Sequence, residues 1–227
     1  MSTESQNLSR HPIVVILGHV DHGKTTLLDY IRKTRVAARE AGGITQRLGA
    51  YEIDWNGKKI TFVDTPGHET FSAMRSRGAR VADIAVLVVA ADDGVKPQTK
   101  ESIETITKAK IPFLVAANKI DKNTADIDRT KSGLAEAGVL VEGWGGQVPL
   151  VPISAKEGTG VDDLLETILL LAEGAELKAD PSLPATGVVI ESHMDSRRGP
   201  SATLLVTNGT LKKGGFVQAD NVFAPVR

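Results

Sequence analysis

The sequence lacks cysteine, so neither disulfide bonds nor thiolate metal sites can form. It also lacks an excess of charge of either sign, because 27 basic residues stand against 28 acidic ones, for a net charge of −1. The chain as a whole is therefore not a general binder of polyanions. No apolar run approaches the roughly 20 residues that span a bilayer, and the polar N-terminus lacks the apolar segment of a secretory signal. These absences predict a soluble, cytoplasmic protein without a membrane partner.

A glycine-rich stretch organises the N-terminal part of the chain. Residues 18–25 read GHVDHGKT and fit the phosphate-loop pattern G-x-x-x-x-G-K-[ST]. An apolar, β-branched run at 13–17 predicts a buried strand before it, and residues 26–31 carry apolar side chains at helical spacing after it. Strand, loop and helix N-terminus direct backbone N–H groups at one point, which attracts phosphate. A chance match is the alternative, but the flanking elements favour a true phosphate loop.

The phosphate loop supplies the first candidate site residues. We expect Lys24 to reach the β and γ phosphates and the Thr25 hydroxyl to coordinate magnesium. The other nucleotide contacts expected from this loop are Asp21, His22, Gly23 and Thr26.

Strands alternate with helices along most of the chain. We expect strands over residues 13–17, 51–55, 60–63, 84–90, 113–117 and 148–153. We expect helices after the phosphate loop and over residues 69–79, 97–109, 126–137 and 161–173. Asn56-Gly57 predicts a hairpin turn between the second and third strands, whereas residues 33–48 have no clear period and predict a mobile loop. The pattern predicts an α/β fold with a mainly parallel six-stranded sheet, whose ligands bind at the C-terminal strand ends.

The helical period disappears near Lys178. Residues 180–184 read DPSLP and predict a stiff linker, and strand-like runs follow over 188–192, 202–206 and 216–217. These runs predict the opening of an antiparallel β-barrel with too few residues to close it, so we expect a fragment of a longer protein. The predicted divisions are a disordered leader at 1–11, a nucleotide-binding domain at 12–178, a linker at 179–184 and a partial barrel domain at 185–227.

A motif after the third predicted strand points to hydrolysis. Asp64-Thr65-Pro66-Gly67 places the Asp64 carboxylate near magnesium, through a bound water, because magnesium retains several waters. The backbone N–H of Gly67 could then donate to the γ-phosphate.

Two further motifs point to guanine. In Asn118-Lys119-Ile120-Asp121, the Asp121 carboxylate can accept from N1–H and the 2-amino group of guanine, donors that adenine does not offer in that arrangement. The Lys119 stem would lie along the base, and Asn118 would tie the loop together. In Ser154-Ala155-Lys156 the Ala155 N–H could donate to guanine O6. Each short motif alone is compatible with solvated loop residues, but four of them in this order after strands favour a GTPase.

The motifs resemble those of translational GTPases, and among them bacterial translation initiation factor two. The resemblance covers about residues 12 to 220 and rests on GHVDHGKTTLLD, EAGGITQ, DTPGHETF, AADDGVKPQT, NKID, SAKEGTG and VTNGTLKKGG. Elongation-type relatives usually have Arg-Gly-Ile-Thr where this chain has Gly42-Gly43-Ile44-Thr45, which favours initiation over elongation. One departure is Arg47, where the family more often has histidine.

The resemblance implies roles for residues that the motifs alone do not assign. Thr45 and Gly67 would hold the γ-phosphate and magnesium, and loss of that phosphate would release both loops. His68 would orient the attacking water as the catalytic residue, restrained by Val20 and Ile44 until activation.

The resemblance also implies partners. The family acts on the small and large ribosomal subunits, promotes their joining and assists initiator tRNA placement through a C-terminal module that this sequence does not contain. We therefore expect a monomeric GTPase that contacts the ribosome, uses Mg²⁺ and hydrolyses GTP slowly alone. The alternatives are a nucleotide-dependent binding switch with negligible hydrolysis, and an elongation-type translational GTPase.

Asp21 has two interpretations. A carboxylate in an anion-binding loop repels phosphate, and a potassium or sodium ion between Asp21 and the phosphates would offset that repulsion and stabilise charge on the leaving oxygen. Alternatively, Asp21 accepts hydrogen bonds from backbone N–H groups nearby. Zinc bound by His19, Asp21 and His22 is not expected, because a compact phosphate loop cannot also converge three side chains on a metal.

Overall fold

The structure is a computed structural model that describes residues 8–35, 50–63, 78–195 and 199–226. The chain divides into two compact units: His11–Ala175 forms one, and Glu176–Arg227 together with Met1–Arg10 forms the other. Among the described helices, none has the length and apolar character needed to cross a membrane.

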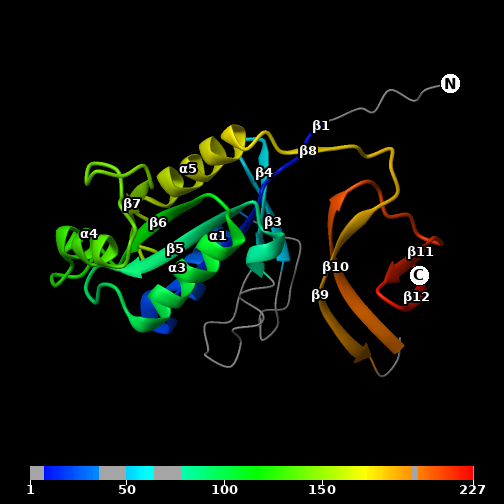
Figure 1. Cartoon of the computed structure of the whole chain (residues 1–227), viewed down its shortest axis with the longest axis horizontal. Helices are drawn as coiled ribbons and strands as arrows, with labels where there is room; N and C mark the ends of the chain where they lie inside the picture. The colour runs from blue at the N-terminus through cyan, green and yellow to red at the C-terminus, as the bar shows by residue number, and fades with distance from the viewer. Residues whose placement is uncertain (1–7, 36–49, 64–77, 196–198, 227) are drawn as a thin grey trace. The chain divides into compact units, whose positions relative to one another are not determined.

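A six-stranded sheet forms the centre of the first unit (Figure 1). Its strand order is β3-β4-β2-β5-β6-β7, and every neighbouring pair is parallel except β3 and β4. The strands are β2 (Ile13–Gly18), β3 (Ala50–Trp55), β4 (Lys58–Val63), β5 (Ile84–Ala90), β6 (Phe113–Asn118) and β7 (Leu150–Pro152). The predicted α/β fold with a mainly parallel six-stranded sheet is confirmed.

The register of the central strands creates the edge where the site lies. Every residue of β2 and β5 is buried, as expected for apolar strands covered on both faces. Gly18 pairs with Val88 and Ala90 pairs with Asn118, so β2, β5 and β6 end close together. The loops that follow these strands therefore emerge at the same edge of the sheet.

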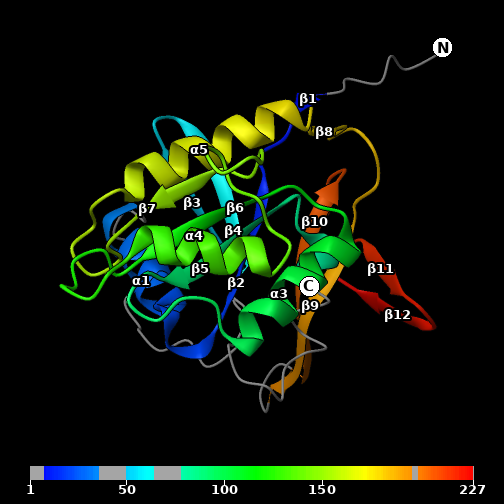
Figure 2. The same cartoon turned by 60° about the vertical axis from the view of Figure 1, so that its left-hand side comes forward.

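Helices cover both faces of this sheet. In Figures 1 and 2, α3 (Pro97–Ala109) and α5 (Val161–Gly174) flank it on opposite sides, and both contact β5. Helices α1 (Lys24–Arg35) and α4 (Ile127–Glu136) belong to the same unit. Helix α4 begins where the Asp126 side chain accepts a hydrogen bond from the Arg129 N–H at 2.8 Å, a typical N-cap.

Several predicted bounds differ from the observed ones. Helix α1 continues to Arg35, so the loop predicted from residue 33 begins later, and its remainder lies outside the described residues. Strand β7 is shorter than predicted, because Val148 makes only an isolated bridge with Val141. Of the predicted helix at 69–79, residues 69–77 lie outside the described residues, and residues 78–81 are helical.

The second unit contains a short ladder that the sequence did not indicate. Strand β1 (Leu8–Ser9) pairs antiparallel with β8 (Lys178–Ala179), and the Arg10 N–H extends the ladder by donating to the Leu177 carbonyl at 3.1 Å. The disordered leader predicted for residues 1–11 is therefore wrong at Leu8 and Ser9. The backbone pairing comes from a distant segment, so no local pattern signals it.

The predicted linker packs on the strands that follow it. Asp180 is buried, and its N–H donates to the Asn208 side chain at 2.7 Å. Its carboxylate accepts from the Ser182 N–H at 2.9 Å, which fixes a local turn. The Thr210 N–H donates to the Leu183 carbonyl at 3.0 Å. Residues 180–184 thus belong to the second unit rather than standing free of it.

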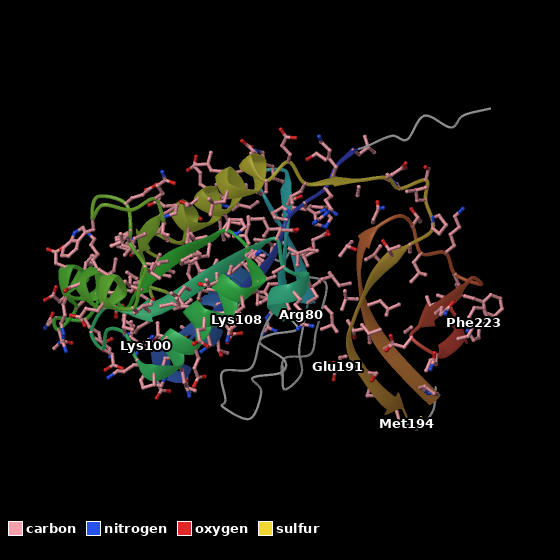
Figure 3. The ribbon with its side chains drawn as sticks, viewed as in Figure 1. Arg80, Lys100, Lys108, Glu191, Met194 and Phe223 are labelled. Carbon is pink, nitrogen blue, oxygen red and sulfur yellow. The ribbon has the colours of Figure 1, made fainter. Side chains whose placement is uncertain are left out.

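Two antiparallel strand pairs make up the rest of the second unit. Strand β9 (Thr186–Asp195) pairs with β10 (Gly199–Asn208), and β11 (Phe216–Ala219) pairs with β12 (Val222–Pro225). These are the barrel-like strands that the sequence predicts, arranged in the described residues as two separate ladders. The side chains of Met194 and Phe223 are exposed (Figure 3).

Candidate nucleotide-binding site

The phosphate loop is built around two glycines that permit close backbone contacts. Gly18 ends β2, and a Cβ there would lie 2.3 Å from the Val88 carbonyl oxygen. Gly23 has φ +87°, and a Cβ there would lie 2.4 Å from the Asn118 side-chain nitrogen. Between them runs a short 3-10 turn, η1 (Val20–His22). No other residue fits either position without displacing a neighbouring strand or loop.

Lys24 places its ammonium inside the curve of this loop. Its side chain is only 6% exposed, and Nζ donates to the Gly18 carbonyl at 2.8 Å and the His19 carbonyl at 2.5 Å. Thr25 and Thr26 are exposed in the first turn of α1, where the backbone N–H groups of a helix lack intrahelical acceptors. Ammonium, N–H groups and helix N-terminus together favour an anion at this point.

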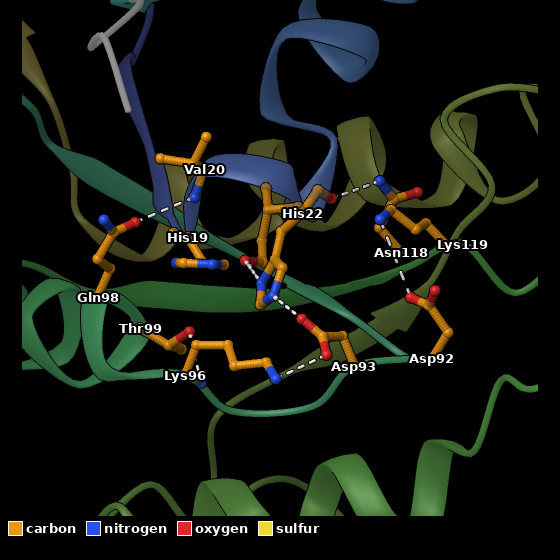
Figure 4. Close-up of polar contacts among 12 residues, drawn as sticks. His19, Val20, His22, Asp92, Asp93, Lys96, Gln98, Thr99, Asn118 and Lys119 are labelled. Atoms are coloured by element: carbon orange, nitrogen blue, oxygen red, sulfur yellow. Dashed lines mark hydrogen bonds and ion pairs between the residues drawn. The ribbon is translucent and has the colours of Figure 1, made fainter. Parts of the chain in front are cut away.

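Asn118 joins the phosphate loop to the two loops after β6 and β7. It is 2% exposed, and its side-chain nitrogen donates to the His22 carbonyl at 2.8 Å (Figure 4). Its side-chain oxygen accepts from the Ala155 N–H at 2.9 Å. Asn118 therefore ties together not one loop, as the sequence suggested, but three. The Ala155 N–H, predicted to meet guanine O6, here donates to Asn118.

Asp121 is oriented by the loop after β7. The Ser154 hydroxyl donates to Asp121 Oδ1 at 2.7 Å, and the same hydroxyl accepts from the Glu157 N–H at 3.2 Å. This hydrogen bond from Ser154 is the main reason why the pKa of Asp121 lies below its usual value, so the carboxylate is ionised near neutral pH. Lys156 is exposed next to this loop. The carboxylate is thus fixed at one oxygen by a buried serine.

His22 turns its side chain away from the phosphate loop and into the protein. The ring is buried, with Nδ1 3.4 Å from the Val88 carbonyl oxygen and Nε2 3.6 Å from Asp93 Oδ2. Burial lowers the pKa of His22 to about 4, so the ring is neutral at physiological pH. Any nucleotide contact by His22 must therefore use its backbone rather than its imidazole.

The segment between β5 and α3, together with the first turn of α3, contacts the phosphate loop from outside, which the sequence did not predict. Asp93 faces His22 and pairs with Lys96 at 2.7 Å, and the hydrogen bond from Lys96 is the main cause that lowers the pKa of Asp93. The Val20 N–H donates to the Gln98 side chain at 3.1 Å (Figure 4). These residues belong to the AADDGVKPQT stretch. Because this stretch directly follows a buried strand, its position in the sequence could have indicated that it lies near the phosphate loop.

The described structure brings together part of the predicted residue set. The phosphate-loop residues meet Asn118, Asp121, Ser154 and Ala155 at the C-terminal edge of the sheet, while Asp21 is exposed on η1 and Val20 is partly exposed. The candidates that lie outside the described residues are Ile44, Thr45, Arg47, Asp64, Gly67 and His68. The described part forms a two-ended site, with anion-binding groups at one end and an oriented carboxylate at the other.

Two family models match the chain. The elongation factor Tu GTP binding domain matches residues 9–173, and elongation factor G domain 2 matches residues 184–227. Translation initiation factor IF-2 from Campylobacter curvus (strain 525.92) is 58% identical over 220 residues, which are 97% of this chain and 24% of that protein. The chain thus spans about a quarter of the length of this relative.

Solved structures of translation factors are also similar to this chain. GDP-bound aIF5B from Aeropyrum pernix matches with a TM-score of 0.76 and 36% identity, over 92% of this chain and 44% of that one. Elongation factor SelB from Methanococcus maripaludis, in complex with the GTP analogue GPPNHP, matches with a TM-score of 0.69 and 26% identity, over the same shares. The chain therefore belongs to the translational GTPases that share the elongation factor Tu GTP binding domain, and within them it is of the IF-2 type.

Proposed function

We propose that these residues are the GTP-binding and GTP-hydrolysing core of a translation initiation factor. The observation that carries this proposal is the pair of side-chain hydrogen bonds of Asn118, to the His22 carbonyl and from the Ala155 N–H. They fix the phosphate loop and the guanine-reading loops in one frame, so a nucleotide can engage both ends of the site at once. The matches to IF-2 and aIF5B support an initiation factor over an elongation factor, because both exceed the identity to SelB.

At the phosphate end, Lys24 and the first turn of α1 would bind the β and γ phosphates. The Thr25 hydroxyl would hold Mg²⁺ together with Thr45 and with Asp64 through a water, and Gly67 would donate to the γ-phosphate. The exposed hydroxyl of Thr25 beside an anion-binding loop fits such an ion. Bound Mg²⁺ would neutralise charge on the phosphate oxygens.

At the base end, Asp121 would accept from N1–H and the 2-amino group of guanine. Ser154 already occupies one side of that carboxylate and holds it ionised. The Lys119 stem would lie along the base. The Ala155 N–H would reach O6 by sharing or exchanging its bond to Asn118, and Lys156 would lie beside the base.

Hydrolysis would depend mainly on positioning, since phosphoryl transfer needs little covalent help from the protein. His68 would orient the attacking water once the ribosome has displaced its restraint, so turnover without ribosomes would be slow. Asp21 has no side-chain hydrogen bond within the described residues, which supports its availability to a potassium or sodium ion beside the phosphates.

The proposed partners are the two ribosomal subunits in the cytoplasm, with the chain acting as a monomer. Initiator tRNA would be handled by a C-terminal module beyond the units described above.

Nucleotide binding and multiple-turnover hydrolysis, each measured with and without ribosomes, test the proposal. We expect tight binding of GTP and GDP, none of ATP, slow hydrolysis alone and a large increase on ribosomes. Binding that is selective for guanine without any ribosome-stimulated hydrolysis would instead establish a nucleotide-dependent binding switch. Equal binding of ATP would refute the proposal.

A further inference from the structure

Asp92 lies at the turn after β5, and its carboxylate forms ion pairs with two lysines of the loop that contains Asp121. Oδ2 accepts from Lys122 Nζ at 2.6 Å. Oδ1 lies 4.0 Å from Lys119 Nζ (Figure 4). The Asp92 side chain is only 13% exposed, whereas those of Lys119 and Lys122 are more open. One largely buried carboxylate thus faces both lysines that flank Asp121 in the sequence.

The backbone holds Asp92 firmly against this loop. The Ala91 N–H donates to the Asn118 carbonyl at 2.7 Å, and the Asp126 N–H donates to the Ala91 carbonyl at 2.9 Å. The Lys122 N–H donates to the Lys119 carbonyl at 3.1 Å, and Lys119 itself has the left-handed φ of 66°. This tight turn lets both ammonium groups reach the same carboxylate.

The charges are arranged to keep Asp92 ionised. Burial raises the pKa of Asp92, but the hydrogen bond from Lys122 and the charge of Lys119 outweigh it, so that the pKa lies below its usual value. The Lys122 hydrogen bond also raises the pKa of that lysine. Lys122 fixes one carboxylate oxygen, and the other stays directed at Lys119. An isolated surface pair contributes little, but here the attraction restricts where the Lys119 stem can lie.

We propose that Asp92 is a positioning residue for the guanine base, which draws the Lys119 ammonium outward so that its aliphatic stem lies along the base. Lys122 anchors the opposite oxygen of Asp92 and thereby acts indirectly on Lys119. This inference rests on the proposed function, because it requires a guanine nucleotide between Lys119 and Asp121. Asp92 touches neither base nor phosphate in this scheme, and it acts only through Lys119.

Dissociation of fluorescently labelled GDP from the purified chain, with competition by unlabelled GDP and IDP, tests the role of Asp92. Asp92→Asn should speed GDP dissociation by about two- to fivefold, the size expected for a partly exposed charge pair. IDP lacks the 2-amino group that Asp121 reads but keeps the ring face, so its affinity should fall by the same factor. Glu104→Gln is the matched control, because it removes an exposed carboxylate paired with Lys108 on α3 (Figure 3) and should change nothing.

A double-mutant cycle identifies the route of the effect. Lys119→Met keeps a stem of similar length without its charge, so Asp92→Asn should add nothing further in that background. Lys122→Met should speed dissociation less than Asp92→Asn does. If Asp92→Asn fails to fold, as judged by its thermal midpoint, Asp92→Glu enters the same cycle, and its effect should likewise vanish in Lys119→Met.

Two results would overturn the inference while leaving the proposed function intact. One is a loss from Asp92→Asn that is equally large in the Lys119→Met background, and the other is a change in the ratio of GDP to IDP affinity. Both would mean that Asp92 supports the whole loop, including Asp121, rather than Lys119. A wild-type chain that binds no guanine nucleotide would refute the proposed function itself, and the inference with it.

Discussion

The Asn118 side chain donates a hydrogen bond to the backbone carbonyl of His22, 2.8 Å away and 96 residues earlier in the chain. This contact joins the end of β6 to the phosphate loop, and the same amide accepts from the Ala155 N–H. Both partners of Asn118 are backbone groups, so these two hydrogen bonds do not depend on the side chains of His22 and Ala155. Replacing Asn118 should therefore disturb both ends of the site together.

Asn118→Ala should lower the free energy of unfolding by about 2–4 kcal/mol, because it leaves the buried His22 carbonyl and Ala155 N–H without partners. Urea unfolding without nucleotide measures this loss. Asn123→Ala, at an exposed position in the same loop, is the control and should change the stability by less than about 0.5 kcal/mol. Equal stability of the two variants would contradict the structural role of Asn118.

Asp121→Asn should change which base the site accepts. An amide can donate where the carboxylate accepts, so guanine loses a charge-assisted pair of hydrogen bonds and xanthine, with a carbonyl at position 2, gains a partner. We expect GTP affinity to fall by at least about tenfold and xanthosine triphosphate affinity to rise. Competition between the two nucleotides measures the switch, and an unchanged preference would remove Asp121 from the base site.

His68→Ala should separate hydrolysis from binding. His68 lies outside the described residues. The resemblance to translational GTPases implies that it would orient the attacking water rather than bind the nucleotide. We expect nearly unchanged GTP affinity and loss of most ribosome-stimulated hydrolysis, measured in the same preparation. Parallel losses of both would indicate instead a histidine that braces the loop.

The buried His22 should make stability depend on pH. Its pKa is lowered from 6.5 to about 4, so the unfolded chain binds a proton in this range while the folded chain does not. The free energy of unfolding therefore has its full value above about pH 6.5. It decreases as pH falls toward 4, by up to about 1.4 kcal/mol per pH unit. Urea unfolding at pH 7 and pH 5 measures the slope. His22→Gln should reduce this slope, and an unchanged slope in that variant would show that His22 is not its source.

Asp21 should confer a dependence on small monovalent cations. If it holds potassium or sodium against the phosphates, intrinsic hydrolysis should be faster in potassium than in a bulky organic cation, and Asp21→Ala should abolish the difference. Ribosome-stimulated hydrolysis in potassium should fall in the same variant. A wild-type rate that ignores the cation would refute the idea, and a dependence that survives Asp21→Ala would assign the ion to other ligands.

Most of the central sheet could be predicted because its signals are local. The strand at 84–90 and the helix at 97–109 were predicted with the observed bounds, since a fully apolar run marks the first and Pro97 at the helix start marks the second. The β1–β8 ladder and the packing of Asp180 on Asn208 could not be predicted, because each depends on backbone groups far apart in sequence.

The candidate site divides in the same way. Its motifs can be recognised in the sequence by their residue types and spacing, and the structure brings the described motifs to one edge of the sheet. The residues that support these motifs could not be recognised in this way, because their contacts depend on side-chain directions that spacing does not determine. These contacts are Gln98 with Val20, Asp93 with His22, and Asp92 with Lys122. The nucleotide and magnesium contacts themselves stay predictions.

The β1–β8 ladder has a consequence for the order in which the protein is made. Leu8 and Ser9 are synthesised before the first unit, but their partners, Ala179 and Lys178, follow only after the whole of His11–Ala175. The first unit can therefore fold while β1 is still unpaired, since domains generally form as units during translation. The ladder can therefore close only after the whole first unit has been synthesised, even though Leu8 and Ser9 precede that unit in the sequence.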